Sequence, residues 1–111
     1  TQWTGCLFQH DRNGVAMRGV KAEIAHDGTR QEEPFASSEE LQQVIKPGDW
    51  NDYEIVAEGP RISLWINGKL MCEVVDKDAK MSRSRGFIAL QMHPGPPMKV
   101  QFKDLRIKIL R

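Results

Sequence analysis

The clearest pattern along the chain is a strict alternation of apolar and polar side chains near its middle. In Arg61–Ile66 every second residue is aliphatic, which is the period of a β-strand that buries one face. Asn67-Gly68 follows at once, and these two residues accept the positive φ angles of a tight type I′ turn. The pattern therefore predicts a β-hairpin whose second strand covers residues 69–75.

Three further segments of the second half have strand character. Residues 51–57 combine aromatic and β-branched side chains with charged ones and end at a Gly-Pro turn signal. Residues 87–93 alternate, and the proline-rich stretch after them lacks the N–H donors of a regular ladder. Residues 98–110 alternate loosely, and a slip of phase at Lys103-Asp104 predicts a β-bulge.

The first half has weaker signals. Residues 4–9 and 15–25 are typical of strands, with a turn over residues 11–14 between them. Residues 37–45 predict one short helix, because Ser37 and Glu40 have capping-box spacing and Leu41, Val44 and Ile45 form an apolar face. Several short strands with a single helix predict an all-β fold, an antiparallel β-sandwich or barrel.

Composition and charge restrict the protein's class. The 111 residues suffice for one domain over residues 1–111, with 40% hydrophobic and 28% charged residues. The net charge is +1 and basic residues do not cluster, which argues against nucleic acid as a partner. No apolar stretch approaches the roughly 20 residues of a membrane span, and no signal peptide is visible.

Neither cysteine lies in a sequence motif for metal binding or redox activity. Cys6 and Cys72 belong to no CxxC pair and no zinc-ligand spacing. Both have apolar neighbours, so we expect buried free thiols. A disulfide between them is the alternative in an exported protein.

Three stretches in combination carry a family resemblance: KPGDWNDY at 46–53, WING at 65–68 and GFIALQMHPGPPMKVQFKDLRIK at 86–108. Together they resemble the C-terminal portion of the 3-keto-disaccharide hydrolase family. The resemblance implies a concanavalin A-like jelly-roll sandwich, with further strands preceding this portion in complete members. An incomplete sandwich leaves an unpaired edge and an uncovered apolar face, which predicts a homodimer or another homo-oligomer that covers them.

The same resemblance implies a carbohydrate ligand and cleavage of glycosides oxidised at C3. The ketone acidifies the neighbouring C–H, so cleavage proceeds by proton abstraction and elimination, followed by hydration. That route needs one base, with a divalent metal on the ketone as an option, rather than the paired carboxylates of ordinary glycosidases. A periplasmic or secreted location is also implied.

His93 is the candidate catalytic base. Strand phase places it with Gln91 on the face opposite Ile88, Leu90 and Met92, and an amide beside an imidazole suits sugar recognition. The alternative is that His93 only hydrogen-bonds the adjacent Pro-Gly loop. Trp65, on the non-core face of its strand, is either a stacking platform for a sugar ring or simply buried.

Arg18 and Glu23 lie in a strand-like segment and are further candidates for substrate binding. Trp50, which begins a strand, is expected in the core, whereas Trp3 is either core or exposed at an edge. His10 and His26 are expected in solvated turns. Two other functions stay open, a non-catalytic carbohydrate-binding sandwich and a partial domain that acts as a structural or assembly unit.

Overall fold

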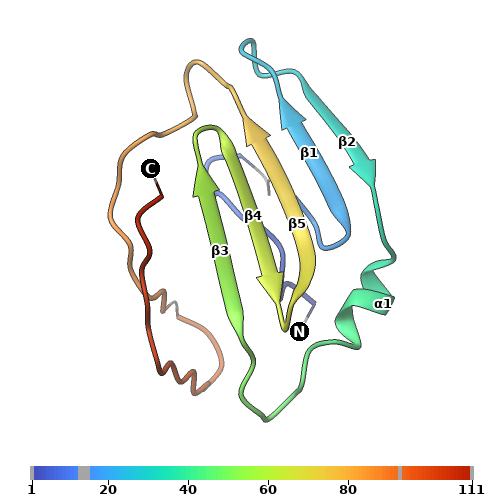
Figure 1. Cartoon of the computed structure of the whole chain (residues 1–111), viewed down its shortest axis with the longest axis vertical. Helices are drawn as coiled ribbons and strands as arrows, with labels where there is room; N and C mark the ends of the chain where they lie inside the picture. Colours follow the sequence, from blue (N-terminus) through green and yellow to red (C-terminus); the bar gives the residue numbers. More distant parts are fainter. Residues whose placement is uncertain (1, 13–15, 93, 111) are drawn as a thin grey trace.

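The computed structural model describes residues 2–12, 16–92 and 94–110. In these residues five strands form one sheet with the order β2-β1-β5-β4-β3, and one short helix, α1, follows β2 (Figure 1). The bounds are β1 Val20–Ile24, β2 Arg30–Pro34, α1 Ser38–Gln42, β3 Tyr53–Glu58, β4 Arg61–Ile66 and β5 Lys69–Asp76. The predicted fold class, all-β with one short helix, is confirmed.

The hairpin of β4 and β5 forms where the alternation predicted it. Asn67 and Gly68 have φ angles of 50° and 79°, the left-handed values that a two-residue type I′ turn requires. β4 pairs antiparallel with β5 on one side and with β3 on the other. The register shifts between Leu64 and Trp65, so Met71 is an extra residue on β5.

One junction of the sheet departs from the antiparallel pattern. β1 lies parallel to β5, with Lys21 opposite Glu73, and antiparallel to β2. Parallel neighbours need a long crossover, and here the chain between β1 and β5 includes β2, α1, β3 and β4. Local alternation cannot reveal this pairing, because it depends on where a distant segment returns.

The N-terminal strands are shorter than predicted. The predicted strand over residues 4–9 is wrong: residues 4 and 5 lie in a turn, residues 6, 8 and 9 have no regular structure, and Leu7 makes one antiparallel bridge with Ala16. The predicted strand 15–25 begins only at Val20, because Gly19 has a φ of 89°, which an extended strand does not adopt. Residues 13–15, which include half of the predicted turn over 11–14, lie outside the described residues.

The helix and β2 show how tertiary contacts override local signals. α1 is shorter than the predicted 37–45, and Ser37 makes no side-chain capping hydrogen bond, so the capping box is wrong. Leu41 is buried, while Val44 and Ile45 are half-buried against the core from the turns after the helix. β2 was not predicted, since its residues are all exposed and charged or polar except Pro34.

The sheet has one buried face, which we call the core face. The N-terminal segment, by which we mean the described residues before β1 (2–12 and 16–19), passes behind β4 and β5 in Figure 1 and covers this face. Leu41 of α1 also packs there. Met71 is fully buried, and its side chain lies against Gly5. The buried apolar residues of the sheet are Ala22, Ile24, Leu64, Ile66, Met71, Cys72 and Val74.

The C-terminal part of the chain contains the largest departure from expectation. The strands predicted over 87–93 and 98–110 are wrong, because residues 87–92 and 94–110 belong to no strand. The predicted bulge at Lys103-Asp104 is a bend in which Asp104 has a φ of 54°. A strand needs a hydrogen-bonding neighbour, and alternation alone does not supply one. His93 lies outside the described residues.

The remaining expectations concern tryptophan and cysteine. Trp50 was expected in the core, and this is wrong: it is 46% exposed, with the Lys103 ammonium 4.3 Å from its ring centroid. Trp3 is exposed. The free thiols are confirmed, with Cys72 buried and Cys6 half-buried. No helix among the described residues is long and apolar enough to cross a bilayer.

Candidate functional site

The second face of the sheet, which we call the open face, carries charged side chains. It consists of the residues that alternate with the core face, and in Figure 1 no segment crosses in front of it. Strand pairing aligns Lys21, Glu73 and Ser63 in one row across β1, β5 and β4. Glu23, Val75 and Arg61 form the next row. The open face therefore sets carboxylates beside cations.

A shallow depression of about 700 Å³ lies on the open face over β2, β1, β5 and β4. In it Arg61 Nε lies 3.7 Å from Glu73 Oε1. Carboxylates, an ammonium, a guanidinium and an amide supply both donors and acceptors, which suits a polar, hydroxyl-bearing ligand. The lining residues are Lys21, Ala22, Glu23, Gln31, Glu32, Glu33, Arg61, Glu73 and Val75.

Two of the predicted site residues share this face. Glu23 is exposed on β1 within the depression. Trp65 is half-buried on β4, where it pairs with Glu54 and Leu70. Arg61 is in the Glu23 row, and Trp65 lies four residue steps further along β4, a distance of roughly 13 Å. The structure thus brings Trp65 and Glu23 to one surface but not into contact.

Arg18 has a different setting. It is 5% exposed and lies outside the depression. Its guanidinium donates to the backbone oxygen of Ser38 at 3.0 Å, the backbone oxygen of Thr4 at 2.7 Å and Gln42 Oε1 at 3.1 Å. These bonds tie the N-terminal segment to α1, so the predicted role of Arg18 in substrate binding stays a prediction.

Gln91 lies in the exposed C-terminal part of the chain, outside the five-stranded sheet. Its predicted neighbour His93 falls outside the described residues, so their shared face stays a prediction. Sequence reasoning missed Arg61 and Glu73 as members of a charged surface. The alternation in β4 and β5 places both residues on the face of the sheet away from the aliphatic side chains. Their proximity to β1, however, depends on the parallel pairing of β1 with β5.

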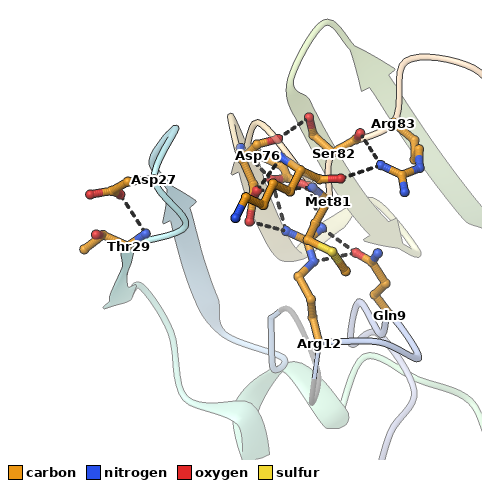
Figure 2. Close-up of polar contacts among 10 residues, drawn as sticks. Gln9, Arg12, Asp27, Thr29, Asp76, Met81, Ser82 and Arg83 are labelled. Atoms are coloured by element: carbon orange, nitrogen blue, oxygen red, sulfur yellow. Dashed lines mark hydrogen bonds and ion pairs between the residues drawn. The ribbon is translucent and has the colours of Figure 1, made fainter.

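A second polar cluster lies at the end of β5, where Arg12 bridges to Asp76 (Figure 2). Arg12 Nη1 donates to Asp76 Oδ1 at 3.1 Å and Nη2 to Oδ2 at 2.6 Å, while Nε donates to Gln9 Oε1 at 2.7 Å. The hydrogen bond from Arg12 lowers the pKa of the Asp76 carboxyl and raises that of Arg12.

The loop after β5 closes the same cluster. Asp78 is 8% exposed, and its Oδ1 accepts hydrogen bonds from the backbone N–H groups of Lys80 at 2.8 Å and Met81 at 3.1 Å. Among the described residues no buried side-chain polar atom lacks a partner. The cluster therefore joins the N-terminal segment to the sheet, and its polar groups form hydrogen bonds with one another.

The part of the chain that the structure describes contains no preformed metal-binding site. No group of three or more His, Cys, Asp or Glu side chains there is placed to hold an ion. Separately, Asp27 accepts a hydrogen bond from the Thr29 backbone N–H in an exposed turn (Figure 2). The Thr29 side chain and then this backbone N–H, by hydrogen bonding to the carboxylate, lower the Asp27 pKa.

Comparison with known proteins places these observations in context. Residues 1–108 match the family described as the 3-keto-alpha-glucoside-1,2-lyase-like domain. Neither the curated proteins nor the solved structures include a significant match to the chain. The match supports a carbohydrate-related role, in agreement with the polar open face.

Proposed function

The chain belongs to the 3-keto-alpha-glucoside-1,2-lyase-like domain family, and from this premise we propose that it binds and cleaves 3-keto glycosides on its open face. The match over residues 1–108 is the observation that carries the proposal. The depression on the open face supports it, because a sugar presents hydroxyl groups that both donate and accept hydrogen bonds.

The proposed reaction begins at the carbon beside the ketone. A base removes the C2 proton, and the ketone at C3 takes up the electron pair as an enolate. The pair then forms the C1–C2 double bond, the bond from C1 to the glycosidic oxygen breaks, and that oxygen receives a proton. Water adds to the resulting enone in a later step. The protein must therefore supply a base and positive charge near the enolate oxygen.

The open face carries groups suited to these tasks. Lys21 and Arg61 are cations on neighbouring rows and can stabilise the enolate oxygen. The Glu23 carboxylate is exposed on β1, in the same row as Arg61, and it can accept hydrogen bonds from sugar hydroxyls. His93 is the proposed base, with Trp65 and Gln91 orienting the sugar ring.

The test is turnover of a 3-keto disaccharide, followed by chromatography of the released sugar, with and without added divalent cation. His93→Ala is expected to lower kcat by about 10²-fold or more, the contribution of a general base. Glu23→Gln is expected to raise KM, and Glu39→Gln on α1 is the matched control that leaves both constants unchanged. Deuterium at C2 of the substrate should slow the reaction if proton abstraction limits the rate.

Each outcome distinguishes among the functions considered. Turnover that is unchanged by His93→Ala would assign the base elsewhere. Binding of a 3-keto disaccharide without any product would favour a carbohydrate-binding module over an enzyme. Absence of both binding and turnover would contradict the proposal.

A further inference from the structure

The C-terminal segment, which we define as residues 98–110, exposes a series of large apolar side chains. None of its described residues is in a strand, although its sequence alternates as a strand does. Exposed apolar stretches of this length are unusual on monomeric proteins and mark interaction surfaces. The exposed fractions are Met98 58%, Val100 59%, Phe102 50%, Leu105 70%, Ile107 76%, Ile109 75% and Leu110 48%.

β3 is the other exposed element of this region. Among the described residues it is the last strand of the sheet and pairs with β4 alone, so the backbone groups on its other side have no strand partner there. Pairing with β4 puts Tyr53 and Ile55 on the core-face side, yet they remain 52% and 62% exposed. Glu54 and Glu58 alternate with them on the open-face side.

Residues 105–109 and the β3 edge are complementary in polarity, and they include one opposite-charge pair, Glu54 with Lys108. If residues 105–109 pair antiparallel with β3, apolar side chains meet apolar ones and a cation meets a carboxylate. Cross-strand pairs of both kinds stabilise antiparallel sheets. The matched register is Tyr53 with Ile109, Glu54 with Lys108, Ile55 with Ile107, Val56 with Arg106 and Ala57 with Leu105.

The direction of the chain selects a second copy as the donor of this strand. In Figure 1 the C-terminal segment runs beside β3 in the same direction, and the contact of Lys103 with Trp50 holds it near the start of β3. Within one chain the segment therefore meets β3 only in the parallel sense, whose pairing is slightly less stable. A copy related by a two-fold axis perpendicular to the strands presents the segment antiparallel.

We propose that two copies of this chain form a two-fold dimer in which residues 105–109 of each copy add as an antiparallel strand to the β3 edge of the other. Such an interface is closed, because each copy donates one strand to its partner and accepts one strand from it across the two-fold axis. A standard stable interface covers about 1,600 Å² in total, and strand addition contributes main-chain hydrogen bonds besides buried side chains. The net charge of +1 opposes association only weakly. This inference goes beyond the proposed catalytic function and does not depend on it.

The test is sedimentation velocity from about 1 to about 100 μM, a range that brackets micromolar dissociation constants. The expected species has twice the 12.7 kDa chain mass. Glu54→Lys and Lys108→Glu should each raise the dissociation constant by roughly tenfold or more, since each sets two like charges opposite each other in both halves of the interface. Glu39→Lys on α1 is the charge-matched control.

Mixing the two charge-reversed chains provides the decisive arm. Each variant alone repels its own copy, but the mixture restores an opposite-charge pair at both sites, so a heterodimer should form with near wild-type affinity. Protection of the residue 105–109 amides from hydrogen exchange should rise with protein concentration. A monomer at all concentrations, a dimer indifferent to both substitutions, or protection that is independent of concentration would each overturn the proposal.

Discussion

Replacement of Arg12 by methionine is expected to destabilise the fold by about 3 kcal/mol, because it leaves the Asp76 carboxylate without its charged partner. The side chains of Arg12 and Asp76 are 16% and 12% exposed, so solvent screens the pair little. Two hydrogen bonds join them, at 2.6 Å and 3.1 Å. The same guanidinium also binds Gln9 and so fastens the N-terminal segment to β5.

The assay is urea unfolding followed by tryptophan fluorescence at pH 7, at one protein concentration so that any self-association is constant. Arg83→Met is the matched control, because Arg83 is exposed and donates only to the backbone oxygens of Lys80 and Ser82. We expect it to cost less than about 0.5 kcal/mol. In a double-mutant cycle with Asp76→Asn, the two losses should sum to more than the loss in the double variant.

The pKa shift of Asp76 gives the sign of the pH dependence. Its folded pKa is lowered by the hydrogen bond from Arg12, so the unfolded state takes up a proton first as the pH falls. The stabilisation is fully present above the unfolded value of about 3.9 and is lost as the pH falls through the folded pKa. In Arg12→Met, the free energy of unfolding should therefore fall less steeply as the pH is lowered. A destabilisation below about 0.5 kcal/mol, or an unchanged acid limb, would refute the assigned role of the pair.

Two further predictions address backbone strain and thiol reactivity. In urea unfolding, Gly19→Ala should lower the free energy of unfolding by more than about 2 kcal/mol, since its φ is 89° and a Cβ would clash with the Ala36 backbone oxygen. Gly59→Ala is the control: with a φ of 56° and open space around it, the loss should be only about 1 kcal/mol. Equal losses in the two variants would contradict the steric argument. Burial raises the pKa of Cys72 to about 12, so a thiol reagent at pH 8 should modify Cys72 only after unfolding, and rapid modification of Cys72 in the native state would show that it is accessible.

The hairpin of β4 and β5 illustrates what a local pattern can determine. Alternation and Asn67-Gly68 are read over neighbouring residues, and both the turn geometry and the buried face of β4 agree with them. The family resemblance is of the same kind, since it rests on residue identities, and the match over residues 1–108 confirms it.

The predicted site residues show the limit of predictions from local sequence patterns. Trp65 and Glu23 lie on one face as their strand phases allow, but Arg18, from the same predicted strand as Glu23, is buried against α1. Gly19 separates the two environments, because its positive φ ends the strand phase between Arg18 and Val20. Phase arguments hold only within an uninterrupted strand.

From the amino-acid sequence alone we could predict the all-β class, the hairpin and the family, and free thiols were favoured over a disulfide. Each of these depends on residue type or on spacing between near neighbours. The parallel pairing of β1 with β5, the strand state of β2 and the exposed C-terminal segment are visible only in three dimensions. Those features depend on which distant backbone supplies hydrogen-bonding partners, and a linear pattern carries no information about which segment that is.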